Sequence, residues 1–220
     1  MISPYINTKL YTHVSLLPNQ MDNKLYINLK KNLENKVLKR CFNDKGYIMD
    51  IYKILEYKDG VIEAENPSGS AIFDVSFSCR LCIPLKGKQI VCKVDRVNKL
   101  LITVTNGPIL IIITNERIND KVFFTDNNNN LRYKIDGASR SLEPGDFVKV
   151  TIINTTFNNG DDKIKAIGFI DDIANEEEKK LFFSELYDTS MEMTSYEKYI
   201  NQENAEETEG VQKPIPEAVL

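Results

Sequence analysis

The side chains best suited to chemistry in this sequence are four cysteines and a single histidine. Cys79 and Cys82 form a Cys-x-x-Cys pair, a spacing used elsewhere for zinc binding or disulfide exchange. The pair lies in a β-like run over 72–83, and residues three apart on a strand point to opposite faces. The two sulfurs therefore diverge. Without a second Cys-x-x-Cys, we predict reduced cysteines that pack as small hydrophobic side chains.

Material for catalysis is scarce elsewhere in the chain. His13 alternates with apolar neighbours, which predicts a structural role in a strand. Asp161-Asp162 and Asp171-Asp172 are paired carboxylates, but adjacent residues on a strand face opposite ways. The sequence has no phosphate-binding loop, no dinucleotide-binding glycine motif and no nucleophile elbow. We expect no catalytic activity, no cofactor and no metal site.

Length and composition narrow the class of protein. The chain has 220 residues, which predicts one large or two small domains. Hydrophobic residues make up 42% and charged residues 27%, values typical of soluble globular proteins. The longest apolar run, 109–113, is far shorter than the roughly 18 residues that span a bilayer. The N-terminus does not resemble a signal peptide, so we expect an intracellular protein without membrane contact.

The net charge of −4 hides an asymmetry along the chain. Residues 1–175 hold 24 basic and 20 acidic side chains, whereas residues 176–220 hold 4 basic and 12 acidic ones. The start of this acidic tail predicts an amphipathic helix over 176–187 that uses Leu181, Phe182 and Leu186. Beyond residue 201 we expect disorder. The tail serves either as a solubilising segment or as an interaction segment.

The body divides at Pro84 into two parts. The first part, 1–83, predicts a strand, a helix and a three-stranded antiparallel meander, which together make a small α+β domain. The strands are expected over 9–17, 47–57, 61–65 and 70–83, and the helix from Asp22 to Arg40. Four apolar residues form one stripe along that helix: Leu25, Leu29, Leu33 and Val37.

The second part, 84–175, predicts an all-β domain. Its short strands are expected over 88–97, 100–105, 109–114, 131–135, 147–154 and 163–171, with a short helical connector over 115–120. A polar loop over 126–130 marks an insertion after the third strand. This pattern fits a small closed β-barrel, and an OB-fold is the leading candidate. The fold class is therefore an α+β domain, an OB-fold barrel and an acidic C-terminal tail.

Several short motifs in this order resemble one family. They are Leu17-Pro18, the run 45–48, Pro84-x-x-Gly87 with Ile90-Val91, Val97-Asn98-Lys99, Gly107-Pro108 and the run 165–172. Together they resemble the stalk subunit of DNA-directed RNA polymerase, the seventh subunit of the eukaryotic RNA polymerase II and its archaeal counterpart. The excess of Lys over Arg and the many Ile and Asn residues are common where coding DNA is AT-rich, as in large DNA viruses.

The resemblance implies a function without catalysis. Such subunits dock on the polymerase core through a tip domain, here 1–83, and pair with a smaller helical partner subunit. Their OB-fold domain, here 84–175, contacts nascent single-stranded RNA. The protein would then act in the nucleus of a cell, or in the cytoplasmic virus factory and virion of a virus. The resemblance assigns core docking to Pro18, Asn19, Gln20, Met21, Gly46 and Tyr47.

The expected RNA contact is weak. OB domains of this family carry aromatic residues on their second and third strands, where this chain has Leu100, Leu101, Thr103 and the run 109–113. Without aromatic side chains on which bases can stack, contacts to the phosphates should contribute most of the affinity for RNA. The candidate RNA-binding residues are Lys88, Lys93, Arg96, Lys99, Lys149, Lys163 and Lys165.

Two questions stay open at the level of sequence. Outward-facing residues of 109–113 either cover the first domain or meet a partner. The chain as a whole is either a stalk subunit or a free-standing OB-fold RNA-binding protein in translation or RNA decay. Residues 1–83 favour the stalk subunit, because a generic RNA binder does not need them.

Overall fold

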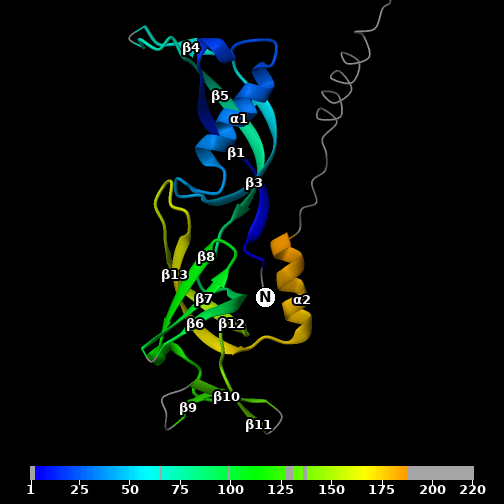
Figure 1. Cartoon of the computed structure of the whole chain (residues 1–220), viewed down its shortest axis with the longest axis vertical. Helices are drawn as coiled ribbons and strands as arrows, with labels where there is room; N and C mark the ends of the chain where they lie inside the picture. The colour runs from blue at the N-terminus through cyan, green and yellow to red at the C-terminus, as the bar shows by residue number, and fades with distance from the viewer. Residues whose placement is uncertain (1–2, 65, 99, 127–130, 136–137, 188–220) are drawn as a thin grey trace, which may run out of the picture. The chain divides into compact units, whose positions relative to one another are not determined.

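The computed structural model describes residues 3–64, 66–98, 100–126, 131–135 and 138–187. This part of the chain is mostly β, with a closed five-stranded barrel and two α-helices (Figure 1). A barrel with a small insertion is consistent with the predicted OB-fold.

The N-terminal sheet is organised around one central strand. β5 (Ala71–Cys82) pairs antiparallel with β1 (Tyr5–Leu16) on one edge and with β3 (Gly46–Tyr57) on the other. The short β2 (Cys41–Phe42) extends the sheet beyond β3. β4 (Val61–Ile62) pairs with β5 where β3 has ended, so it continues the same edge. The predicted meander is therefore wrong in its order: β3 pairs with β5 directly, and β1 fills the second edge.

The helix α1 (Leu25–Val37) covers one face of this sheet. Leu29, Leu33 and Val37 are buried in a common core with the α1-facing side chains of β1, β3 and β5, as the stripe predicted. The helix is shorter than expected at both ends. Asp22 precedes it and accepts the backbone N–H of Lys24 through Oδ1 at 3.0 Å, which fixes the entry to the first turn.

The barrel closes in the order β12-β13-β8-β7-β6. Its strands are β6 (Gln89–Val97), β7 (Leu101–Asn106), β8 (Ile109–Thr114), β12 (Phe147–Thr156) and β13 (Ile164–Ile173). β8 and β13 run parallel, and the other neighbouring pairs are antiparallel. Gly168 lets β13 pass close to its neighbours, because a Cβ there would lie 2.5 Å from Val150 Cγ1. The inward side chains of all five strands form one apolar core.

The segment between β8 and β12 differs from the prediction. The connector 115–120 contains one 3-10 turn, η2 (Asn115–Arg117), but 131–135 is not a barrel strand. It is the middle strand of a separate sheet made of β9 (Phe123–Thr125), β10 (Leu131–Ile135) and β11 (Ala138–Ser141). Phe123 and Tyr133 are buried in an edge-to-face contact of 6.2 Å between ring centroids. This aromatic pair anchors the small sheet to the barrel core, so β10 pairs locally.

The cysteines pack as the strand geometry predicted. Cys79 is buried in the core under α1, whereas Cys82 is buried in the barrel core, so the two side chains point away from each other. Burial raises the pKa of Cys79 to about 12 and that of Cys41 to about 11. At neutral pH these thiols stay protonated, which makes them poor nucleophiles and poor metal ligands.

Polar contacts join the N-terminal sheet to the barrel on two sides. On one side, Tyr5 Oη donates to Asn106 Oδ1 at 2.7 Å, and Asn106 Nδ2 donates to the Val91 carbonyl at 2.6 Å. The Arg80 guanidinium lies 5.0 Å from the centroid of the Tyr5 ring and donates to the backbone carbonyl of Glu185 in α2 (Glu176–Tyr187). All three side chains, Tyr5, Arg80 and Asn106, are buried.

On the other side, the loop between β12 and β13 meets β2. The backbone N–H of Cys41 donates to the Asp161 carbonyl at 2.8 Å, and Gly160 N–H donates to the Cys41 carbonyl at 2.8 Å. Asn159 Oδ1 accepts the N–H of Asn43 at 3.0 Å. The two bonds at Cys41 continue the sheet's hydrogen bonding into the barrel loop, so the junction is fixed by backbone as well as side chains.

Gly107 should be intolerant of a side chain for two separable reasons. Its φ of +55° favours glycine, and an added Cβ would overlap Tyr5 Oη and lie 2.9 Å from Leu186 Cδ1. Gly87 is the matched control, because it has a φ of +75° with nothing within 4 Å of the added Cβ. We expect Gly87→Ala to lower the free energy of unfolding by about 1 kcal/mol and Gly107→Ala by about 3 kcal/mol. Urea unfolding of the two variants measures both. Equal losses would mean that the Tyr5–Asn106 contact does not constrain this turn.

Candidate nucleic-acid and docking surfaces

On the outside of the barrel, a row of residues across β13, β8, β7 and β6 has a lysine at each end. The register places Lys165 of β13 opposite Leu110 of β8, Leu110 opposite Thr105 of β7, and Thr105 opposite Lys93 of β6. Lys93 and Lys165 are exposed, and their strand neighbours point into the core. Since adjacent strands lie about 4.8 Å apart, the path from one lysine to the other along the curved barrel surface over β7 and β8 is about 14 Å.

A second row lies beside the first. It contains Ile167, Ile112, Thr103 and Arg96, which the register places opposite one another in that order. Ile112 and Ile167 are 39% and 42% exposed. The two rows therefore carry cations at three of their four ends, with aliphatic and threonine side chains between them, and we name these eight residues the barrel face. β7 and β8 are the second and third barrel strands, the ones that bind nucleic acid in OB-folds.

The structure groups some of the predicted RNA-binding residues and separates others. Lys93, Arg96 and Lys165 share the barrel face, and the exposed Lys163 immediately precedes β13. Lys88 lies apart, before β6, where its carbonyl accepts the N–H of Ile152. Lys99 lies outside the described residues.

The ammonium of Lys149 already forms ion pairs with two carboxylates. Its side chain is 15% exposed, and its Nζ lies 3.3 Å from Asp172 Oδ2 and 3.5 Å from Glu178 Oε1. Two carboxylates therefore compensate one ammonium, which leaves little charge for a phosphate. We leave Lys149 out of the proposed RNA contacts.

The helix α2 explains why Lys149 is covered. The predicted helix over 176–187 is present, and its Phe182 packs against Phe147 with ring centroids 5.3 Å apart. Val91 and Ala174 complete this small core on the outside of the barrel. Leu181, expected on the apolar side, is instead 53% exposed. α2 thus covers part of the outer side of β6 and β12 without burying the exposed aliphatic residues of β8 and β13.

The predicted docking residues fall at two ends of the N-terminal sheet. Pro18, Asn19 and Gln20 form the 3-10 turn η1 (Pro18–Gln20) after β1, and Met21 follows it, partly buried against the core. Gly46 and Tyr47 begin β3 at the opposite end, beside Cys82. Gly46 has a structural role, because its φ is +137° and an added Cβ would lie 2.6 Å from the Cys82 carbonyl oxygen.

An exposed apolar group marks the end of the sheet that carries η1. Leu17 is 47% exposed, Val61 65% and Ile62 59%. β1 and β4 flank the same end of β5, since Leu16 and Ile62 both pair with Ala71. We name Leu17, Val61 and Ile62 the distal group. Sequence reasoning missed Val61 and Ile62, although two apolar residues between turn signals were a visible sign.

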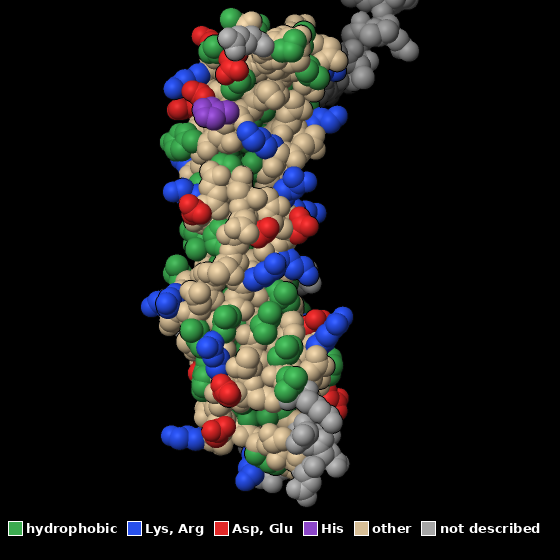
Figure 2. All heavy atoms as spheres, turned by 90° about the vertical axis from the view of Figure 1, so that its left-hand side faces the viewer, with side chains coloured by type: hydrophobic (Ala, Val, Ile, Leu, Met, Phe, Trp, Pro, Cys, Tyr) green, Lys and Arg blue, Asp and Glu red, His purple; other side chains and the backbone are tan. Residues whose placement is uncertain are grey.

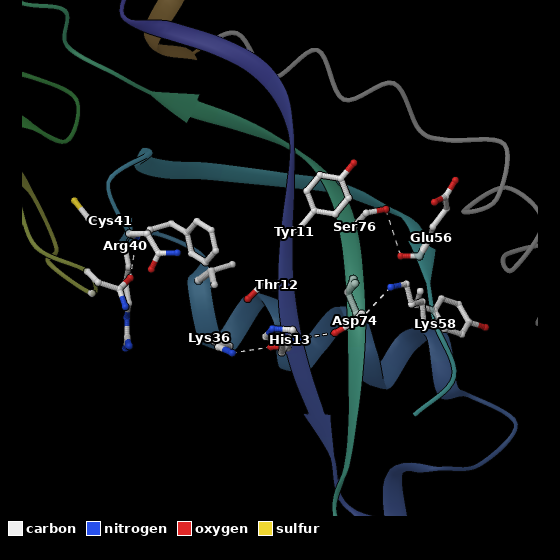
Figure 3. A pocket seen from close by; sticks show the side chains of 17 residues that line it. Tyr11, Thr12, His13, Lys36, Arg40, Cys41, Glu56, Lys58, Asp74 and Ser76 are labelled. Atoms are coloured by element: carbon white, nitrogen blue, oxygen red, sulfur yellow. Dashed lines mark hydrogen bonds and ion pairs between the residues drawn. The ribbon is translucent and has the colours of Figure 1, made fainter. Parts of the chain in front are cut away.

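A groove of about 920 Å³ lies on the N-terminal sheet (Figure 3). His13 Nδ1 contacts Asp74 Oδ1 at 2.5 Å, Lys58 Nζ lies 3.5 Å from Asp74 Oδ2, and Lys36 Nζ donates to the His13 carbonyl at 2.6 Å. The hydrogen bond from His13 is the main reason why the pKa of Asp74 lies below its usual value. These contacts tie β1 to β5 and α1, in agreement with a structural His13.

Two further observations concern only the described part of the chain. No group of three or more His, Cys, Asp or Glu side chains there is arranged to hold a metal ion. No helix formed by these residues has the length and apolarity needed to cross a membrane.

Comparisons with known proteins agree with the resemblance seen in the motifs. No model of a protein family matches the sequence. The chain is 38% identical over 181 residues to a protein of Acanthamoeba polyphaga mimivirus described as a DNA-directed RNA polymerase subunit, covering 82% of this chain and 88% of the relative. It is 26% identical over 152 residues to the DNA-directed RNA polymerase II subunit RPB7 of Glycine max, covering 66% of this chain and 85% of the relative.

The lysines of the barrel face should differ from Lys149 in the salt dependence of RNA binding. We expect Lys93→Gln and Lys165→Gln each to weaken binding of a single-stranded oligoribonucleotide and to lower the slope of log K against log salt by about 0.7, the value for one lost phosphate contact. Lys149→Gln is the control and should leave the slope unchanged. Fluorescence anisotropy across a salt series measures this. Equal slopes for all four proteins would contradict the assignment of the barrel face.

Proposed function

Because this chain belongs to the family of DNA-directed RNA polymerase subunits that includes RPB7, we propose that it is a non-catalytic stalk subunit. In this proposal the N-terminal domain is the tip that docks on the polymerase core, and the barrel contacts nascent RNA. A smaller helical subunit binds alongside. The protein acts where its polymerase transcribes, in the nucleus of a cell or in the virus factory and virion of a large DNA virus.

The distal group is the observation that carries the docking proposal. Val61 and Ile62 belong to a two-residue strand at a sheet edge, and both expose more than half of their side-chain surface. An edge strand presents unpaired backbone N–H and C=O groups with which another chain can pair, so proteins usually cover such an edge or place charged residues on it. Here the edge carries two aliphatic residues, and Leu17 adds a third at the same end. Docking on a large partner would bury them.

The proposed RNA contact is weak and electrostatic. The barrel face offers cations at its edges and aliphatic or threonine side chains between them, and none of its rows contains an aromatic residue. Phosphate contacts of this kind do not distinguish sequences. This suits a subunit that must accept any transcript.

For the smaller helical partner we propose the outer side of α2. Leu181 is 53% exposed there. Phe183 lies about 200° further round the helix and packs on Phe147 with ring centroids 5.4 Å apart. A helical partner with an apolar stripe would cover Leu181 beside the apolar core that already joins Phe147 and Phe182.

A native pull-down separates the stalk subunit from a free-standing RNA-binding protein. The tagged full-length chain, isolated from the organism that encodes it, should recover the large polymerase subunits and one small helical subunit. Charges in the distal group should prevent core docking, so we expect Val61→Lys combined with Ile62→Lys to reduce recovery of the large subunits tenfold or more.

Ile167→Lys is the matched control, because Ile167 is an aliphatic residue with 42% exposure on the barrel. It should leave recovery of the core unchanged, and thermal unfolding should show that both variants stay folded. Full recovery by the distal variant would exclude the distal group as the docking site. Recovery of ribosomal or RNA-decay components, or of RNA alone, would instead favour the free-standing OB-fold protein.

A further inference from the structure

The small sheet between β8 and β12 has two unlike faces. Phe123 and Tyr133 turn inward and are almost fully buried, at 2% and 3% exposure. Phe124 pairs with Arg132, and Arg132 pairs with Ser141, so these three residues share the opposite, outward face. An aromatic ring thus lies on the outward face, although an aromatic anchor already fills the inward one.

A lysine ammonium lies beside the ring of Phe124. Its side chain is 36% exposed, and Lys134 Nζ lies 5.6 Å from the ring centroid. Arg132, directly across the strand pair, forms an ion pair of 3.1 Å with Asp126. Residues 121–142 contain four basic side chains and two acidic ones, so the insertion has a net positive charge. An apolar protein partner would be expected to meet apolar neighbours here, whereas the cross-strand neighbour of Phe124 is Arg132, and Ser141 lies beyond it on β11.

Phe124 also lines a groove of about 810 Å³ between the small sheet and the barrel. Asn98, Asn115 and Ser141 contribute polar groups to its wall, and Asp120 and Glu143 contribute carboxylates. Carboxylates repel phosphates but accept hydrogen bonds from the amino groups of bases. The groove is therefore suited to bases, while the phosphates would run past the lysine side of the ring.

We propose that Phe124 is a base-stacking platform for single-stranded RNA, with the ammonium of Lys134 beside the ring and the groove next to it. The inference deepens the proposed function, on which it rests for the choice of RNA as ligand. An aromatic ring with an adjacent cation is the usual platform for sequence-independent binding of single strands. The aromatic contact that β7 and β8 lack would then come from the insertion.

The sequence allows a direct optical test, because the chain contains no tryptophan. Phe124→Trp introduces one tryptophan at the proposed platform, and Tyr11→Trp introduces one on the N-terminal sheet, where Tyr11 is 73% exposed. A stacked base quenches indole fluorescence. We expect a single-stranded oligoribonucleotide to quench Phe124→Trp in a saturable manner and to leave Tyr11→Trp unchanged. Inorganic polyphosphate, which carries charge without bases, should quench neither variant.

A second test measures the affinity of the full-length chain for the single-stranded oligoribonucleotide. Phe124→Leu keeps the side chain apolar but removes the ring, and should weaken binding of the oligoribonucleotide at least fivefold. Phe124→Tyr should retain the affinity. Unchanged affinity of Phe124→Leu, or equal quenching of the two tryptophan variants, would overturn the proposal. Loss of captured polymerase subunits by Phe124→Leu with unchanged RNA affinity would also overturn it, since the ring would then be a protein contact.

The experiments distinguish a failure of the stacking platform from a failure of the proposed function. If Lys93→Gln and Lys165→Gln weaken RNA binding while Phe124→Leu does not, the RNA-contacting stalk subunit stands and the stacking platform fails. If Phe124→Leu weakens RNA binding but the wild-type chain recovers no polymerase subunits, the platform stands and the stalk function fails. A wild-type chain that binds no oligoribonucleotide overturns the platform, even if it recovers the polymerase.

Discussion

Both cores of this protein depend on the pairing of β5. Its α1-facing residues, such as Cys79 and Leu81, fill the core under α1, whereas Cys82 at its end belongs to the barrel core. β1 pairs with β5 over its whole length, which brings Tyr5 to the barrel turn at Asn106. Because a one-residue slip would turn every side chain to the wrong face, this register specifies both cores at once.

The proposed separation of core docking and RNA contact would follow from this arrangement of β5. The distal group lies where β5 begins, and the barrel follows where β5 ends. In the proposed stalk, the tether to the polymerase would raise the effective concentration of the transcript near the barrel, to millimolar values for short flexible links. Weak RNA contacts through a few lysines and one aromatic ring would then be sufficient. Tight binding would oppose the movement of RNA past a fixed subunit, so the modest charge of the barrel face suits a stalk better than a free-standing binder.

The spacing of apolar residues along the chain predicted individual helices and strands and the faces that they bury. The stripe on α1, the barrel strands and the divergence of Cys79 and Cys82 follow from periods of 3.6 and 2. Pairing partners do not follow from such periods, and the β10 segment was therefore misplaced in the barrel. Lys149 shows the same limit for the site. Alternation turns it outward, but strand pairing places Asp172 of β13 beside it, and the position of α2 adds Glu178. The distal group was missed because exposure at a sheet edge is a tertiary property.

The proposed role of Phe124 would separate RNA binding from folding. β7 and β8 consist mostly of β-branched and aliphatic residues, which favour strands and pack well across a closed barrel. The insertion instead divides its two adjacent phenylalanines by function. Phe123 packs on Tyr133 and holds the small sheet to the core, while Phe124 faces outward beside Lys134. Since adjacent residues on a strand face opposite sides, one dipeptide can supply both the anchor and the proposed platform. The ring can therefore meet bases without any barrel strand giving up core packing.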